Sequence, residues 1–457
     1  MKLYNTLTKT VEDFVPFNGD KVNMFACGPT VYDFAHIGNG RTAITMDVLA
    51  RLLRYLNFNI FYLVNITDID DKIINRAIEQ KISWQDLSKK YEDQYINDMH
   101  KLGIKIDQYA RATDYINDIK KQVTILMDKG HAYKINDGIY FEISTFKDYG
   151  KLSGRHDIEK DDAVSRIDQN DQKKGWNDFC LWKFSKEGEP SWPAQFGDGR
   201  PGWHIEDTAI TEHFFGPQYD IHGGGSDLIF PHHEAELTQM ESASEKTPFV
   251  KYWVHGGLLY INDERMGKSN KNFFTIDEVL AKYDPRAIRL FMLQGHYRST
   301  LNFSFKLLDS CVNRLLRWIR LADLRWQADQ AGEASENDVN EIERIFQNFI
   351  HNLENDLDTP NSIAELEKFM DYIELKGVSA PIKSLFDGFM LALDNIFGID
   401  LLSDDISSNI KQLIDERQIA RDNSDWQKSD KLRDMLTQKG IQLKDTSKGT
   451  IWYRQTV

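Results

Sequence analysis

Residues 21–56 read KVNMFACGPTVYDFAHIGNGRTAITMDVLARLLRYL and carry the clearest structural pattern in the chain. A short apolar run is broken by Cys-Gly-Pro at residues 27–29, and apolar side chains then recur at helical spacing over residues 44–56. The pattern predicts a strand, a tight turn and a helix. Unpaired N–H groups at a helix start favour anions, and His36 lies just ahead of this helix, placed to donate hydrogen bonds to a phosphoryl group. An ordinary strand–helix unit with an incidental histidine accounts for this stretch equally well.

The composition indicates a globular chain of several domains. Its 457 residues exceed what one core usually serves, and 41% of them are hydrophobic. No run approaches about 18 apolar residues, and the first residues lack the apolar core of a signal peptide, so we expect no membrane span and a cytoplasmic location. Three separated cysteines argue against a disulfide framework. The net charge of −15 argues mildly against broad nucleic-acid binding.

The next part of the chain predicts a second strand and an insertion. Residues 57–66 form a dense apolar run typical of a buried strand. For the aspartates within residues 68–71 we favour helix capping and solvation, although a metal or ligand site stays open. Residues 72–130 predict mainly helices, and residues 131–143 predict a hairpin around Asn-Asp-Gly. A polar, aromatic-rich segment follows, which we interpret as an insertion between halves of the main sheet.

A second group of chemically active residues follows the insertion. Residues 219–222 predict a short strand, and residues 223–225, all glycine, predict a turn that a nucleotide could approach closely. Asp227 could hold ribose hydroxyls. His232 and Glu236 are four residues apart at the start of a predicted helix, so both lie on one face as metal ligands often do. A capped helix with a surface His–Glu contact remains the alternative.

The remaining sequence predicts a mobile loop, a helical region and a distinct terminal segment. Lys268 and Ser269 lie in a basic loop that lacks the glycine pattern of a P-loop. Residues 305–325 and 341–400 predict helices. From residue 411 to the end, ten Lys/Arg stand against seven Asp/Glu, together with two tryptophans. Such a basic, aromatic segment is where RNA would bind, and a solvated helical tail is the alternative.

Taken together, these residues resemble the cysteinyl-tRNA synthetases, a family of class I aminoacyl-tRNA synthetases, over nearly the whole chain. The motifs that carry the resemblance, in the family's order, are CGPTVYDFAHIGNGRT, NITDIDDKII, PGWHIE, YDIHGGGSDLIFPHHEAE, RMGKS, HYRSTLNFS and DKLRDMLTQKGIQLKDTSKGTIW. The resemblance implies an α/β fold with a Rossmann-like parallel-sheet core. The implied domains are a split nucleotide-binding core (1–110 and 200–262), a connective insertion (111–199), a signature-loop and stem-contact region (263–304), a helical bundle (305–400) and a small anticodon-binding module (401–457).

The resemblance also implies the reaction and the residues that carry it. ATP and L-cysteine give cysteinyl-adenylate, and the cysteinyl group passes to the terminal adenosine of tRNA(Cys); Mg²⁺ accompanies ATP, and the protein is expected to be a monomer. The implied catalytic residues are His36, Asn39 and Lys268. The implied ATP-binding residues are Gly28, Thr30, His36, Gly38, Asn39, His222, Gly223, Asp227, Met266, Lys268 and Ser269. The implied cysteine-binding residues are Cys27, Thr67, Trp203 and His232.

In this family a zinc ion at the base of the amino-acid site takes the substrate thiolate, which accounts for the rejection of serine. The matching positions are Cys27, Asp207, His232 and Glu236. The chain departs from the usual pattern at Asp207, where the family commonly has cysteine. An aspartate can ligate zinc, and as an alternative it could hold His232 or Trp203 in place.

A second departure lies in the signature loop, where Gly267 replaces the more usual serine and loosens the loop around Lys268. Two other functions compete with the synthetase interpretation. A related ATP-dependent cysteine:amine ligase would need no tRNA, and the basic terminal segment argues against it. A non-catalytic tRNA-binding homologue would not need His36 and Lys268, which are both present. Cysteine-dependent pyrophosphate exchange and tRNA charging distinguish the three.

Overall fold

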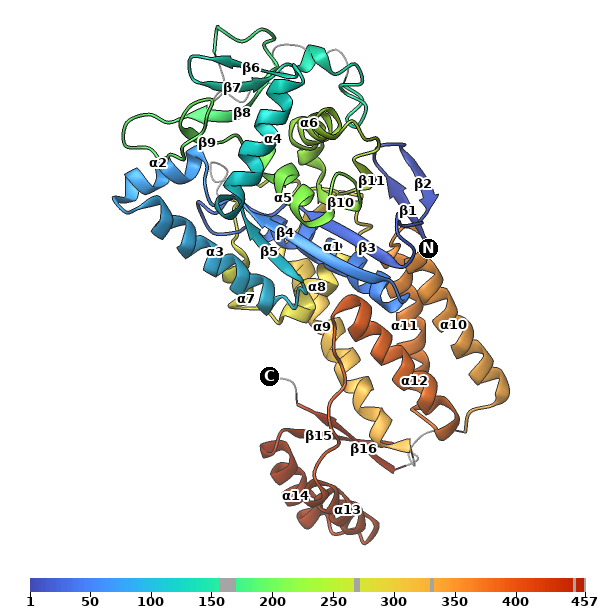
Figure 1. Cartoon of the computed structure of the whole chain (residues 1–457). Coiled ribbons are helices and arrows are strands. Elements are labelled where there is room, and N and C mark those ends of the chain that lie inside the picture. Colours follow the sequence, from blue (N-terminus) through green and yellow to red (C-terminus); the bar gives the residue numbers. More distant parts are fainter. Residues whose placement is uncertain (156–169, 267–271, 329–332, 447–448, 456–457) are drawn as a thin grey trace. The chain divides into compact units, whose positions relative to one another are not determined.

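The computed structural model divides the chain into two compact units (Figure 1). The first consists of Met1–Lys282 and Tyr297–Asn302, and the second of Tyr283–His296 and Phe303–Val457. The described residues are 1–155, 170–266, 272–328, 333–446 and 449–455. The finer division into the domains expected from the sequence stays a prediction.

A five-stranded parallel sheet forms the centre of the first unit, which confirms the predicted fold class. Its order is β11-β10-β3-β4-β5, and every neighbouring pair is parallel. The strands are β3 (Lys21–Ala26), β4 (Asn59–Ile66), β5 (Gln108–Arg111), β10 (Tyr219–Gly225) and β11 (Val250–Gly256). Figure 1 shows β3 and β4 side by side, and α1 (Ile37–Tyr55) connects them along the chain. Helices cover such a sheet on both faces, which explains the continuous apolar runs of its strands.

An antiparallel sheet interrupts the parallel one along the chain, as the sequence predicts. Its order is β6-β7-β8-β9. The strands are β6 (Ala132–Ile135), β7 (Gly138–Phe141), β8 (Phe179–Phe184) and β9 (Gly199–Pro201). β6 and β7 form the hairpin expected around Asn-Asp-Gly. Side chains of β7 and β8 share one hydrophobic core with the helices α4 (Ile116–Asp128), α5 (Ile205–Phe215) and α6 (Glu234–Ser244).

Shorter elements complete the first unit. Among the described residues of the whole chain, no helix is long and apolar enough to cross a membrane. The strands are β1 (Lys2–Asn5), β2 (Thr10–Asp13), β12 (Leu259–Ile261) and β13 (Glu264–Arg265), and β14 (Leu301–Phe303) begins in this unit and ends at the first residue of the next segment of the second. The helices are α2 (Asp71–Gln80), α3 (Trp84–Lys101) and α7 (Ile276–Leu280), with short turns η1 (Ala112–Tyr115), η2 (Ile143–Thr145), η3 (Ser226–Leu228) and η4 (Ile229–His233).

The second unit is largely helical, as expected for residues 305–400, and ends in a small α/β module. Its helices are α8 (Pro285–Leu293), α9 (Phe305–Ala322), η6 (Asp323–Trp326), α10 (Glu336–Glu354), α11 (Thr359–Lys376), α12 (Ala380–Ala392), η8 (Leu393–Phe397), α13 (Ser408–Asp422) and α14 (Trp426–Gln438). The hairpin of β15 (Ile441–Thr446) and β16 (Gly449–Arg454) closes the chain. The Gln327 side-chain Nε2 donates to the Trp452 carbonyl at 2.9 Å, and the Trp452 N–H donates to Gln327 Oε1 at 2.8 Å, so the hairpin is tied to the end of η6.

Three local expectations are decided by the structure. The aspartates after β4 act as caps and ion-pair partners: Asp70 accepts from the Lys72 N–H at the start of α2. Residues 72–130 are mainly helical, as predicted, and the short strand β5 also lies among them and pairs with β4. The glycines at 223–225 do not form a turn, because they continue β10 and pair in register with β11. A Cβ on Gly224 would lie 2.7 Å from the His233 ring, so a side chain distant in sequence is packed against the strand there.

Candidate active site

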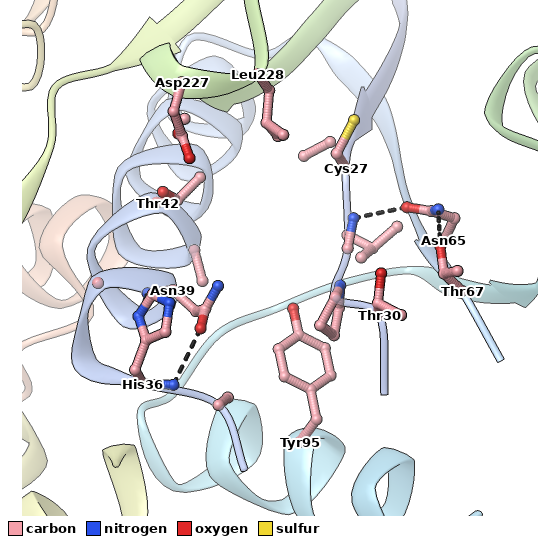
Figure 2. Close-up of a pocket in the computed structure, with 18 of the residues that line it drawn as sticks. Cys27, Thr30, His36, Asn39, Thr42, Asn65, Thr67, Tyr95, Asp227 and Leu228 are labelled. Atoms are coloured by element: carbon pink, nitrogen blue, oxygen red, sulfur yellow. Dashed lines mark hydrogen bonds between the residues drawn. The ribbon is translucent and has the colours of Figure 1, made fainter. Parts of the chain in front are cut away.

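A cavity of about 500 Å³ lies at the carboxyl ends of β3, β4 and β10 (Figure 2). This edge of a parallel sheet is where open α/β folds bind ligands. Most of the predicted site residues line the cavity. They are Cys27, Gly28, Thr30, His36, Gly38, Asn39, Thr67, Trp203, Asp207, Asp227, His232 and Met266. Tyr95, Thr42 and Asn65 line it as well, although the sequence did not single them out.

The turn after β3 brings the backbone close to β4. The Gly28 N–H donates to Asn65 Oδ1 at 2.6 Å, one of the hydrogen bonds drawn in Figure 2. A Cβ on Gly28 would lie 1.8 Å from the Asn65 carbonyl oxygen, closer than any side chain can approach. Glycine is therefore required at this position so that the two strand ends can meet.

His36 and Asn39 cap the start of α1 reciprocally. Asn39 N–H donates to His36 Nδ1 at 3.2 Å, and His36 N–H donates to Asn39 Oδ1 at 3.0 Å. Because Nδ1 accepts, the neutral ring carries its proton on Nε2, where it can serve as a donor. A Cβ on Gly38 would lie 2.9 Å from His36 Nδ1, so glycine keeps the ring in its capping position.

Four predicted metal ligands converge at one end of the cavity. Cys27 Sγ lies 3.4 Å from Asp207 Oδ2 and 4.0 Å from Glu236 Oε1. His232 Nε2 lies 3.0 Å from Asp207 Oδ2 and 2.9 Å from Glu236 Oε1. The four ligand atoms all lie within 4.8 Å of one another. The contact between Asp207 and His232 is compatible with both roles expected of Asp207, direct ligation and support of the imidazole.

The charges of this group call for a cation. Burial, followed by the carboxylates of Glu236 and Asp207, raises the pKa of the Cys27 thiol well above its usual range. Burial alone would lower the pKa of His232, but these two carboxylates raise it to about 9. Among the described residues, buried Glu236 Oε2 has no hydrogen-bond partner. One thiol, one imidazole and two carboxylates fit a divalent metal, which would favour the thiolate and balance the charge of the acids.

A second set of donors shares two members with the first. Cys27 Sγ lies 3.1 Å from His233 Nε2 and 3.4 Å from His222 Nε2, and these atoms group with Glu236 as a further candidate metal site. His222 and His233 are fully buried, and burial lowers the pKa of both imidazoles. Both rings are therefore neutral, the form in which histidine binds a metal. His222 was expected beside adenosine, but it lies against Cys27 and does not line the cavity.

Of the three other predicted residues, Trp203 and Thr67 line the cavity and Gly223 does not. Gly223, expected at the nucleotide, does not line the cavity, and a Cβ there would lie 2.4 Å from Met46 Sδ. Trp203 stacks on His232 with ring centroids 4.2 Å apart and is 41% exposed. The Thr67 hydroxyl donates to Glu206.

The signature loop is only partly described. Lys268 and Ser269, with Gly267, lie outside the described residues. Met266 on one side of this gap and Phe273 on the other both line the cavity. The Ile37 N–H donates to the Phe274 carbonyl at 3.0 Å, which joins the chain after the loop to the start of α1.

The fold and this site define the class of protein. A solved Mycobacterium tuberculosis methionyl-tRNA synthetase bound by methionyl-adenylate shares the fold at low sequence identity (TM-score 0.64, 14% identity, 83% of this chain and 92% of that one). An Agrobacterium radiobacter LeuRS-tRNA-LeuAMS complex is also similar (TM-score 0.64, 11% identity, 85% of each chain). Residues 13–313 match the family described as tRNA synthetases class I (C) catalytic domain. The catalytic part of the chain is therefore that of a class I tRNA synthetase.

Full-length relatives narrow the assignment to one family. A Cysteine--tRNA ligase of Thermoplasma acidophilum is 41% identical over 464 residues, covering 99% of this chain and 100% of the relative. A Cysteine--tRNA ligase of Clostridioides difficile is 41% identical over 469 residues, with 99% and 100% covered. The chain belongs to the cysteine–tRNA ligase family.

Proposed function

We propose that this chain joins L-cysteine to tRNA(Cys) in two steps. In the first, a carboxylate oxygen of cysteine attacks the α-phosphorus of ATP, which forms cysteinyl-adenylate and releases pyrophosphate. In the second, a ribose hydroxyl of the terminal adenosine of tRNA attacks the cysteinyl carbonyl carbon, and AMP leaves. The observation that carries the proposal is the convergence of a helix-capping His36 and a thiol–imidazole–carboxylate cluster on one cavity, in a member of this family.

The nucleotide end of the cavity is assigned to the start of α1. Phosphate oxygens gain charge as pyrophosphate leaves, and fixed donors at a helix N-terminus stabilise that charge without reorganising. His36 Nε2 and the Asn39 side chain are the proposed donors. Lys268 is the proposed catalytic ammonium group, and Asp227, which lines the cavity, is the proposed partner of the ribose hydroxyls. ATP is proposed to bring Mg²⁺ with its phosphates.

The amino-acid end is assigned to the metal-competent cluster, and zinc is the proposed ion. Bound by Cys27, Asp207, His232 and Glu236, zinc supplies a Lewis acid that prefers a thiolate to a hydroxyl. Trp203 stacks on His232 and restricts the space beside it. The neutral, buried His222 and His233 lie behind Cys27, so they add no charge to this end of the cavity.

The terminal module is the proposed site of anticodon binding. Trp426 on α14 is 59% exposed, and Lys428 and Lys431 on the same helix are also exposed. Aromatic and basic side chains together are typical of RNA contacts. A monomer in the cytoplasm completes the proposal. The related amine ligase and the non-catalytic homologue find no support in full-length relatives such as those of Thermoplasma acidophilum and Clostridioides difficile, each named Cysteine--tRNA ligase.

Two assays on the purified chain test the proposal. Cysteine-dependent exchange of labelled pyrophosphate into ATP reports the first step, and attachment of labelled cysteine to tRNA(Cys) reports the second. We expect both. Exchange without charging would favour the cysteine:amine ligase, and tRNA binding without exchange would favour the non-catalytic homologue.

A further inference from the structure

Asn65 lies near the end of β4, directly after the apolar and aromatic run of residues 60–64, and is 2% exposed. All of its polar groups are engaged. Its Oδ1 accepts from the Gly28 N–H at 2.6 Å, and its Nδ2 donates to Asp207 Oδ1 and to Thr67 Oγ1, the latter at 3.4 Å. Figure 2 shows the first and last of these bonds at the wall of the cavity.

These partners leave the amide only one orientation. The Gly28 N–H can only donate, so the atom that faces it must be the amide oxygen. The Asp207 carboxylate accepts, so the atom that faces it must be the amide nitrogen. Buried polar groups that are fully satisfied in this way hold their neighbours rigidly.

The bond to Asp207 determines which carboxylate oxygen is available. Oδ1 is occupied by the Asn65 amide, whereas Oδ2 faces Cys27 Sγ at 3.4 Å and His232 Nε2 at 3.0 Å. Asp207 is therefore presented with a single oxygen toward the cluster. The Asn65 side chain also accepts from the Gly28 N–H. Because Gly28 directly follows Cys27, Asn65 holds a second member of the cluster through the backbone.

We propose that Asn65 is a positioning residue that presents Asp207 as a one-oxygen metal ligand and fixes the turn that carries Cys27. The inference rests on the proposed function, because it concerns the metal at the amino-acid end of the cavity. The Asn65 amide would then determine both which oxygen of Asp207 faces the metal and where the turn beside the amino acid lies. Partners of this kind, which hold a metal ligand in place, typically change metal affinity by about 10- to 100-fold when removed.

The test measures zinc affinity by competition with a chromophoric chelator, in the full chain, for wild type, Asn65→Ala and Asn65→Leu. Leucine keeps the branched shape without polar atoms, so it guards against a result caused by a cavity. Asn5→Ala is the matched control, since Asn5 is also 2% exposed and makes buried hydrogen bonds to Lys251 and Trp253, outside the cluster. Thermal unfolding of each variant reports whether it is folded.

We expect both Asn65 variants to bind zinc about 10- to 100-fold more weakly, with altered thiolate-to-metal absorption when Co²⁺ replaces zinc. We expect Asn5→Ala to lower the melting temperature and leave zinc affinity unchanged. In an Asp207→Ala background, replacement of Asn65 should cost less zinc affinity than it does in wild type, because the bond to the carboxylate is already lost.

Unchanged zinc affinity and Co²⁺ spectrum in the Asn65 variants would overturn the proposal. So would an equal loss of affinity with and without Asp207, because Asn65 would then act elsewhere. Pyrophosphate exchange by the wild type separates these results from failure of the proposed function. A wild type that exchanges normally while the Asn65 variants bind zinc normally refutes only the role of Asn65. A wild type that neither binds zinc nor exchanges refutes both.

Discussion

Two glycines in the first turns of α1 offer a matched pair of substitutions. A Cβ on Gly38 would lie 2.9 Å from His36 Nδ1 and 3.2 Å from Met266 Cε. A Cβ on Gly40 would meet Ile276 at 3.6 Å, an ordinary contact. Both substitutions replace glycine by alanine in one helix, so they differ chiefly in whether the His36 ring must move.

The two substitutions should differ by about 1 kcal/mol or less in the free energy of unfolding, with Gly40→Ala the more stable. Alanine is better than glycine in a helix by about 1 kcal/mol, and Gly40→Ala should gain up to that amount. Gly38→Ala gains the same propensity but forces the ring of His36 away from the Asn39 N–H, and loss of a cap costs about 1 kcal/mol. We therefore expect Gly38→Ala to have nearly wild-type stability.

Their expected effects on activity differ sharply. If His36 donates to the phosphates, moving its ring removes a preorganised donor, and loss of one such donor lowers kcat about 100-fold. Cysteine-dependent pyrophosphate exchange should fall by roughly that factor in Gly38→Ala and stay at the wild-type level in Gly40→Ala. Equal exchange rates for the two variants, with both folded by thermal unfolding, would refute the role assigned to His36.

Other predictions concern the metal, the pH dependence and the terminal module. Asp207→Ala should lower zinc content after dialysis, measured by atomic absorption, together with cysteine-dependent exchange; retained zinc would mean that Asp207 supports His232 without binding metal. Burial raises the pKa of Asp68 from 3.8 to about 6 despite hydrogen bonds from Thr113. The folded state therefore holds this proton to higher pH than the unfolded state, so stability falls as pH rises through that window and is level above it. Asp68→Asn should remove this fall of up to about 3 kcal/mol, measured by urea unfolding between pH 4 and pH 7, and an unchanged slope would contradict the assignment. Arg417→Met should destabilise the terminal module by about 2 kcal/mol, because Arg417 is 2% exposed and pairs with Asp445, and it should lower tRNA charging more than pyrophosphate exchange.

Local patterns made much of the fold predictable. The strand–turn–helix over residues 21–56 is β3, the turn and α1, with His36 as the cap. The spacing of His232 and Glu236 correctly placed them together, at 2.9 Å. Both features depend on neighbouring residues, which is the information that periodicity carries.

Tertiary contacts account for what the sequence left out. β5 has four residues and is a strand because β4 offers it an edge, a fact absent from its own letters. The glycines of β10 resemble a turn, but they are there because side chains such as Met46 pack against them. Asn65 carries a usable signal in the sequence, because it follows the apolar and aromatic run of residues 60–64, where burial of a polar side chain requires a partner.

The most direct test of zinc-dependent selection of cysteine compares cysteine with serine in pyrophosphate exchange by one preparation of the wild-type chain, before and after zinc is removed by a chelator. We predict exchange with cysteine and little with serine, loss of the cysteine-dependent exchange when the metal is removed, and recovery when zinc is restored. Exchange that is equal for the two amino acids, or that persists unchanged without metal, would contradict zinc-dependent selection.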